Sequence, residues 1–162
     1  SLTGGREGGS GGPVSAAAAA EWLRLWLQRR VGDEPPMRLI NGSGLARETR
    51  LSAQQLALLL RQAFESPRMP EFVASLPLAG VDGTLSRQPA RFGAALGRAH
   101  LKTGSLRDVV ALAGYVQSVS NKRYVLVAII NDPLAPAARP ALDALLRWVA
   151  QDAPPAQMGA RP

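Results

Sequence analysis

The sequence predicts an α/β fold of the α+β type, in which an antiparallel sheet is covered by helices. Three β-rich runs follow one another in the second half of the chain, and short turns separate them, so neighbouring strands should be antiparallel. Segments with a helical apolar stripe lie before and after these runs. The last run, residues 123–130 (RYVLVAII), is almost continuously apolar, which is typical of a strand covered on both faces.

Both ends of the chain differ in composition from the middle. Residues 1–15 are dominated by glycine and carry no periodic apolar pattern, so we expect a flexible linker. Residues 153–162 have the composition of a disordered tail. The remaining segment, 16–152, is long enough for one core, and 46% hydrophobic residues in the whole chain is ordinary for a globular protein.

The first predicted helix runs from residue 16 to about residue 30. Ser15 is a favourable N-cap, and Gly32 supplies a stop signal. Trp22 and Trp26 belong to an i, i+3, i+4 apolar stripe on this helix. Tryptophans in such a stripe could line a ligand groove, but the spacing favours a place in the core.

The next elements are predicted from apolar periodicity and from proline positions. After Pro35-Pro36, residues 37–40 form a short strand candidate. Helices are expected at about 53–65 and 71–76. Residues 77–97 are rich in turn residues with little period, and they predict an ordered loop that crosses the edge of the sheet.

Three strands and a helix complete the predicted domain. The strands are expected at 99–103, 109–118 and 123–130, with a hairpin turn at 120–122 between the last two. Small residues in the second strand predict close packing under a helix. A terminal helix with a leucine-rich face is expected at about 141–151.

A Lys102-Thr103-Gly104 triplet stands where the first of these strands ends. Lys-Thr-Gly is one of three boxes of penicillin-binding proteins and class A β-lactamases, beside Ser-x-x-Lys and Ser-Asp-Asn. The other two boxes are absent. Neither of the chain's two lysines has a serine three positions before it, and none of its three asparagines has a serine two positions before it. The chain therefore offers one wall of an acyl-transfer site without the nucleophile.

Three further segments stand in a recognisable order around the triplet. Asn41–Arg47 (NGSGLAR) resembles the Gly-Ser-Gly-Leu-Ser-Arg signature of the D-alanyl-D-alanine carboxypeptidase/endopeptidase family, the class C low-molecular-mass penicillin-binding proteins. Ser75–Leu85 resembles the segment before that family's Lys-Thr-Gly strand, and Ala113–Val116 is similar to the segment after that strand. The resemblance covers about 37–132 and implies the C-terminal part of a transpeptidase-like domain, a partial penicillin-binding protein/β-lactamase-like fold.

Such a resemblance implies a periplasmic serine hydrolase that cleaves D-Ala-D-Ala from peptidoglycan stem peptides through an acyl-enzyme and is trapped by β-lactams. It implies no cofactor. Because the nucleophile box is missing, we expect this chain to be inactive alone and to need upstream residues, in the same chain or in another copy, to complete the cleft. An export signal would then belong to sequence outside these residues.

The resemblance also assigns roles to individual residues. Lys102 would supply a compact charge and Thr103 a hydroxyl for the substrate carboxylate. Gly104 has no Cβ, so a substrate can lie against the strand and pair with its backbone. By resemblance, the Ser105 N–H is one of two oxyanion donors. Arg47 would pair with a stem-peptide carboxylate, or alternatively would hold its own loop through an ion pair.

Several other classes of site are excluded or disfavoured. The chain has no cysteine, so it forms no disulfide and no thiolate metal site. His100 is the only histidine, which excludes a zinc site built on several histidines, and we interpret it as a partly buried strand residue. With no cysteine and a single histidine, we expect no bound metal. No run of about 20 apolar residues is present, so we expect no transmembrane segment.

Two alternative functions remain open on the sequence. A net charge of +7 is compatible with a nucleic-acid partner, but no basic run exceeds two residues and aromatic residues are few, so we expect no such partner. The second alternative is a non-catalytic binding or scaffold module that kept the sheet and lost the chemistry. Replacement of Lys102 distinguishes the enzyme from the scaffold.

Overall fold

The computed structural model describes residues 15–152. The linker predicted at 1–15 lies outside the described residues except for Ser15, and the tail predicted at 153–162 lies wholly outside them. The chain divides into two compact units, and the boundary falls after Ser52. Within the described residues, every helix is too short or too polar to cross a membrane.

The first unit contains helix α1 (Ala16–Val31). Its predicted caps are confirmed: the Ser15 hydroxyl accepts a hydrogen bond of 3.2 Å from a first-turn amide, and Gly32 ends the helix at a φ of 76°. The prediction that the tryptophan stripe is core is wrong for Trp22, which is 65% exposed. Its ring instead stacks against Trp26, with the two ring centroids 6.5 Å apart.

The strand predicted at 37–40 is also wrong. A single residue pair, Arg38 with Arg50, forms a bridge through two hydrogen bonds of 3.0 and 2.8 Å. A strand needs a partner of similar length. Residues 42–44 bend and residues 47–48 form a turn, so the two chain segments meet at only one position.

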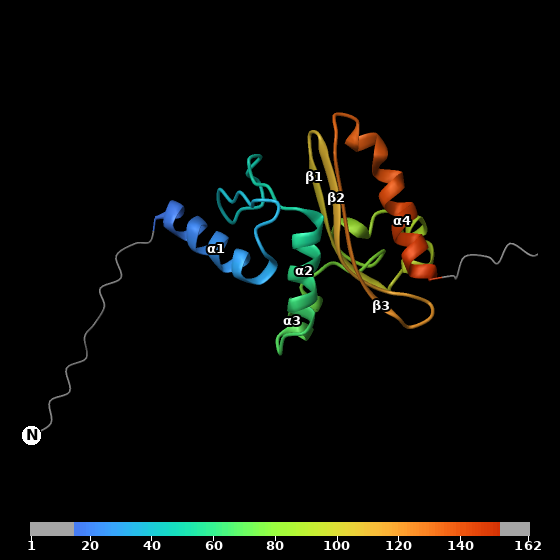
Figure 1. Cartoon of the computed structure of the whole chain (residues 1–162). Coiled ribbons are helices and arrows are strands. Elements are labelled where there is room, and N and C mark those ends of the chain that lie inside the picture. The colour runs from blue at the N-terminus through green and yellow to red at the C-terminus, as the bar shows by residue number, and fades with distance from the viewer. Residues whose placement is uncertain (1–14, 153–162) are drawn as a thin grey trace, which may run out of the picture. The chain divides into compact units, whose positions relative to one another are not determined.

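The second unit confirms the predicted α+β fold. A three-stranded antiparallel sheet lies between helices α2 and α4 (Figure 1), and its strand order is β1-β2-β3. The elements of this unit are α2 (Ala53–Phe64), α3 (Met69–Ala74), β1 (Ala99–Leu106), β2 (Val109–Gln117), β3 (Arg123–Asn131) and α4 (Arg139–Gln151). Strand β1 continues past the predicted end at residue 103, so the whole triplet lies inside the strand.

The two faces of the sheet are covered by different helices. Leu101 of β1 lies opposite Gly114 of β2, and residues directly opposite in an antiparallel pair share a face. Leu101 belongs to a core cluster with Leu146 of α4. Tyr115, whose side chain points to the other face, donates a hydrogen bond of 2.6 Å from its hydroxyl to the Leu60 carbonyl of α2. We call these the α4 face and the α2 face.

Residues 77–97 run along the outer edge of β1, as predicted. The Leu101 N–H donates to the Pro77 carbonyl at 2.9 Å, and the Ala79 N–H donates to the Ala99 carbonyl at 2.8 Å. The segment is more than a surface loop, however, because it also supplies buried side chains. It contains two short 3₁₀ helices, η1 (Gly83–Leu85) and η2 (Pro89–Ala95).

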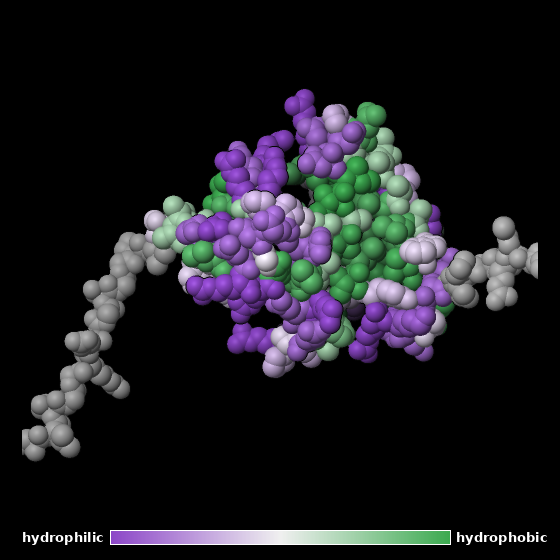
Figure 2. All heavy atoms as spheres, in the orientation of Figure 1, coloured by the Kyte–Doolittle hydropathy of each residue, from purple (hydrophilic) through white to green (hydrophobic). Residues whose placement is uncertain are grey.

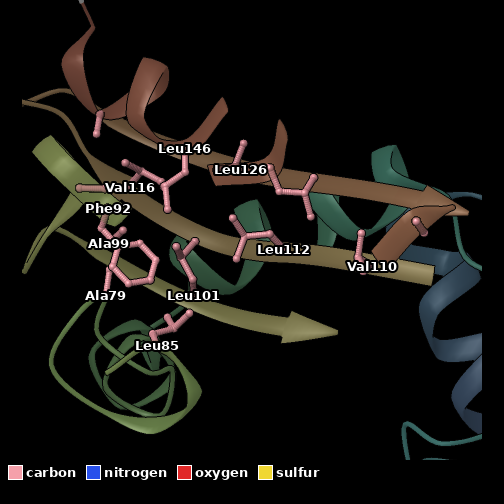
Figure 3. Close-up of a cluster of buried hydrophobic side chains, with 14 residues drawn as sticks. Ala79, Leu85, Phe92, Ala99, Leu101, Val110, Leu112, Val116, Leu126 and Leu146 are labelled. Atoms are coloured by element: carbon pink, nitrogen blue, oxygen red, sulfur yellow. The ribbon is translucent and has the colours of Figure 1, made fainter. Parts of the chain in front are cut away.

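The main core of this unit lies on the α4 face. Figure 3 shows Phe92 and Leu85, both from the 77–97 segment, pointing toward the side chains of β1. Each of these two residues is 1% exposed. The largest fully buried apolar side chains are Phe92, Leu85, Leu101, Leu146, Val110 and Val116. The 77–97 segment therefore closes one side of the core.

Gly114 allows β1 and β2 to approach each other closely. A Cβ at this position would lie 2.1 Å from the carbonyl oxygen of His100, and the φ of Gly114 is 149°. No side chain fits in that space without moving the backbone of β1. The small residues of β2 were expected to serve helix packing, but at Gly114 the constraint comes from the neighbouring strand.

The end of α4 is attached to the β2–β3 hairpin by Asp152. Its carboxylate accepts hydrogen bonds from the Ser120 hydroxyl and, at 2.7 Å, from the Tyr124 hydroxyl. The Lys122 ammonium lies 3.1 Å from the same carboxylate. The hydrogen bond from Ser120, followed by those from Tyr124 and Lys122, lowers the pKa of Asp152 to about 2 from its ordinary 3.8.

We expect this attachment to make the protein less stable in acid. The folded state holds the pKa of Asp152 at about 2 and the unfolded value is 3.8, so the contribution is complete above pH 3.8 and is lost as the pH falls toward 2. Urea unfolding at several pH values between these limits measures the loss. Asp152→Asn keeps the shape without the charge, and its stability should change less over the same range. An unchanged pH dependence in this variant would contradict the assignment.

Candidate functional site

The Lys102-Thr103-Gly104 triplet lies near the middle of β1, and β1 is an edge strand of the sheet. Lys102 is exposed, and its Nζ donates a hydrogen bond of 2.7 Å to the carbonyl of Thr103. The lysine side chain stands on the α2 face because it alternates with Leu101 on the α4 face. The ammonium is therefore held beside the strand margin.

The outer margin of β1 is paired along only part of its length. Leu101 uses its N–H to bind Pro77, so Thr103 and Ser105, two and four residues further on, direct their N–H groups to the same outer side. Among residues 15–152 no backbone acceptor is bonded to either group. Positions 103–105 therefore present a strand margin that an extended peptide can pair with.

Two hydroxyls of this margin have partners from distant parts of the chain. The Thr103 Oγ1 lies 3.0 Å from the Thr84 Oγ1 of η1. The Ser105 Oγ accepts a hydrogen bond of 3.2 Å from Nη2 of Arg139, the first residue of α4. Both hydroxyls are on the α4 face, opposite to Lys102. The margin thus has an ammonium on one side and hydroxyls on the other.

Sequence reasoning missed Thr84 and Arg139 as neighbours of the triplet. Thr84 had a signal, because it belongs to the 75–85 segment that resembles the family. Arg139 had none. Its contact with Ser105 joins residues 34 positions apart, and no local pattern specifies such a pair.

Gly104 stands between the two hydroxyl-bearing residues. A Cβ at this position would lie 3.3 Å from the Cβ of Ala111 on β2, which is tighter than ordinary contact. The missing side chain therefore serves the pairing of β1 with β2. Because Gly104 has no side chain, the backbone of β1 is also uncovered on the α2 face, where we expect the substrate peptide to approach.

His100 lies on the same face as Lys102, one alternation earlier along β1. It is partly buried, as expected, and its Nδ1 is 3.4 Å from the Leu76 carbonyl oxygen. It lines a pocket of about 250 Å³ with side chains of α2, α3 and β2, including Phe64 and Tyr115. The lining of this pocket does not include the triplet, so the pocket is separate from the margin at 103–105.

Arg47 belongs to the first unit. Its loop is held locally: Oδ1 of Asn41 accepts a hydrogen bond from the Ser43 N–H at 3.0 Å, and Nη1 of Arg50 donates to the Arg47 carbonyl at 2.6 Å. The Arg47 side chain is exposed. The structure places Lys102 and Ser105 on one strand with their side chains on opposite faces. The roles of these two residues and of Arg47 stay predictions.

Solved structures share this arrangement of sheet and helices. The chain is similar to penicillin-binding protein 4 (dacB) of Haemophilus influenzae in complex with a β-lactam, with 26% identity and a TM-score of 0.66, covering 85% of this chain and 33% of that one. It also matches the Bd0816 predatory endopeptidase of Bdellovibrio bacteriovorus in fold, with 17% identity and a TM-score of 0.63 over 83% of this chain and 36% of that one. The fold is that of part of a penicillin-binding protein.

The sequence matches narrow this class to one family. The model of the D-Ala-D-Ala carboxypeptidase 3 (S13) family matches residues 6–152, and the chain belongs to that family. Carboxypeptidase DacB of Mycolicibacterium smegmatis is 37% identical over 123 residues, which are 72% of this chain and 26% of the relative. A D-alanyl-D-alanine carboxypeptidase of Actinomadura sp. is 42% identical over 83 residues, 48% of this chain and 15% of the relative. The chain thus spans about a quarter or less of these curated relatives.

Proposed function

We propose that this chain forms the carboxylate-binding wall of a serine-type D-Ala-D-Ala carboxypeptidase/endopeptidase that acts on peptidoglycan stem peptides. The observation that carries the proposal is the unpaired outer margin of β1 at residues 103–105, with the Lys102 ammonium beside it. Family membership supports the same reaction class.

Each group at the margin has a chemical task in this reaction. The Lys102 ammonium and the Thr103 hydroxyl would bind the terminal carboxylate of the peptide. The backbone of residues 103–105 would pair with the extended substrate by strand addition. The N–H of Ser105 would donate to the oxyanion that forms when a serine attacks the peptide carbonyl, and loss of such a donor costs about 2.7–4 kcal/mol in transition-state stabilisation.

The attacking serine would come from a Ser-x-x-Lys box that these 162 residues do not contain. This chain alone therefore remains predicted to be inactive. β-Lactams would bind the same wall, because they too present a carboxylate next to a reactive amide. A cell-wall substrate places the reaction outside the cytoplasm, and the periplasm is our proposed location.

The second unit also exposes apolar residues at the other edge of its sheet, on β3. Figure 2 shows apolar residues gathered over β3 and α4. Val125 and Ile129 of β3 are 37% and 39% exposed, and the outer edge of β3 has no strand partner within the described part of the chain. Long apolar edge strands are normally covered in folded proteins. We propose that upstream sequence, or another copy of the protein, covers this edge.

A binding experiment tests the proposed function on the chain as it is. Nα-acetyl-D-Ala-D-Ala is titrated into the isotope-labelled chain, and amide signals are followed by heteronuclear NMR. We expect the largest shifts at residues 103–105, and the C-terminal amide of the same dipeptide should bind about 100-fold more weakly because it lacks the charge. Equal binding of acid and amide, or shifts confined to other elements, would show that the margin is not a carboxylate site.

A further inference from the structure

The contact between Arg139 and Ser105 brings a second cation to the margin of β1. The guanidinium of Arg139 donates from Nη2 to the Ser105 hydroxyl at 3.2 Å. Ser105 is exposed and Arg139 is half-buried, so this pair lies at the surface and is accessible to a ligand. Within residues 15–152 no carboxylate lies within ion-pair distance of this guanidinium.

Neither helix stability nor core packing explains an arginine at this position. Arg139 is the first residue of α4, and no acidic residue stands in the first turn. A cation at the N-terminus of a helix is disfavoured by the helix dipole, so the placement works against the helix. The buried members of α4 are Leu142, Leu146 and Ala150, and Arg139 is not among them.

The two cations lie on opposite sides of the same three residues. The Lys102 side chain is on the α2 face, and its Nζ is bonded to the Thr103 carbonyl. The Ser105 side chain, with Arg139 attached, is on the α4 face. An anion seated at the margin would therefore meet an ammonium from one side and a guanidinium from the other.

We propose that Arg139 is a specificity residue that makes this site require a free C-terminal carboxylate, an inference that rests on the proposed function. The guanidinium occupies a lone pair of the Ser105 oxygen, so the hydroxyl proton turns away from Arg139 and toward the ligand. The remaining guanidinium donors add positive charge on the α4 side of the carboxylate. A neutral C-terminal amide gains nothing from this charge.

The test compares an acid and an amide on matched variants. Arg139→Gln keeps an amide donor near Ser105 and removes the charge, whereas Arg139→Lys keeps the charge. Arg98→Gln is the control, because Arg98 is an exposed arginine just before the other end of β1 and its loss changes the net charge equally. Dissociation constants for Nα-acetyl-D-Ala-D-Ala and for its C-terminal amide are measured by NMR titration, and urea unfolding confirms that each variant is folded.

We expect Arg139→Gln to weaken binding of the acid about three- to tenfold and to leave binding of the amide unchanged, so that the selectivity ratio falls. Arg139→Lys should retain most of the ratio. The inference is overturned if Arg139→Gln behaves like Arg98→Gln, or if it weakens acid and amide alike, as a structural role would. If the unaltered chain itself fails to prefer the acid, the proposed function falls and this inference falls with it. If the unaltered chain prefers the acid and Arg139→Gln shows the same selectivity ratio, the inference alone is overturned.

Discussion

Replacement of Lys102 with alanine is expected to weaken binding of Nα-acetyl-D-Ala-D-Ala about 10- to 100-fold, the range that corresponds to a lost hydrogen bond to a charged group. The reason is local. Lys102 is exposed beside the unpaired margin at residues 103–105, and its Nζ is already held at 2.7 Å from the Thr103 carbonyl. Its ammonium is therefore in place before the ligand arrives, and little ordering entropy opposes the interaction.

Lys122 provides the matched control for this experiment. It is the chain's only other lysine, it is exposed, and it pairs with Asp152 at the hairpin of β2 and β3. Lys122→Ala changes the net charge equally and should leave the affinity for the dipeptide within about twofold, since exposed charges at long range are screened. A scaffold module would be indifferent to both replacements. Equal affinities of the two variants would therefore favour the scaffold and argue against the enzyme.

Lys102→Arg refines the same prediction. Arginine keeps the charge but replaces a compact ammonium with a planar fork. We expect an affinity between those of the unaltered chain and Lys102→Ala, because the planar guanidinium keeps the charge but does not reproduce the position of the compact ammonium. The difference between the alanine and arginine variants separates the part of the binding that depends on charge from the part that depends on shape.

Local patterns were sufficient to predict much of the second unit. The three strands, helix α2 and helix α4 appear where apolar periodicity and β-branched residues place them. The hairpin turn at 120–122 is confirmed, and Asn121 takes a φ of 63° there. The triplet was found because three adjacent residues carry its signal. Elements of this kind are specified by residues close in sequence.

The contacts that complete the candidate site could not be predicted in this way. Thr84 meets Thr103 across 19 positions, and Arg139 meets Ser105 across 34. These pairs result from the way the 77–97 segment and α4 pack on the sheet. Periodicity contains no information on such packing, because the residues that make the contacts belong to different elements. The strand predicted at 37–40 did not form for the same reason. The length of a strand depends on its partner segment, and here only residues 38 and 50 pair.

In the 77–97 segment, a turn-rich composition did not reveal that the segment contributes to the core. Its prolines and glycines predict a loop, but Phe92 and Leu85 are among the most deeply buried side chains of the chain. Only short 3₁₀ helices form there, and their apolar residues follow neither a helical nor a strand period. The segment is core because of its packing partners, and the sequence contains no periodic signal for that.

Phe92→Ala is therefore expected to destabilise the second unit by about 3–5 kcal/mol, which is the usual cost of removing a buried phenylalanine. A domain of this size is stable by only about 5–15 kcal/mol, so the loss is a large share of the total. Phe72→Ala is the control: Phe72 lies on α3 and is 38% exposed, so its removal should cost about 1 kcal/mol or less. Urea unfolding followed by circular dichroism measures both. Equal costs for the two variants would place the 77–97 segment outside the core.

The same variant connects the core to the candidate site. The 77–97 segment supplies Pro77 and Ala79, which bond to the backbone of β1 at residues 101 and 99. It also supplies Thr84, which contacts Thr103. If the loss of Phe92 frees the segment, the open part of the margin grows and the Thr103 hydroxyl loses its neighbour. In the folded fraction of Phe92→Ala we therefore expect the NMR shifts caused by the dipeptide to spread from residues 103–105 toward Leu101. Shifts that stay confined to 103–105 would show that the segment remains seated on β1 without its phenylalanine.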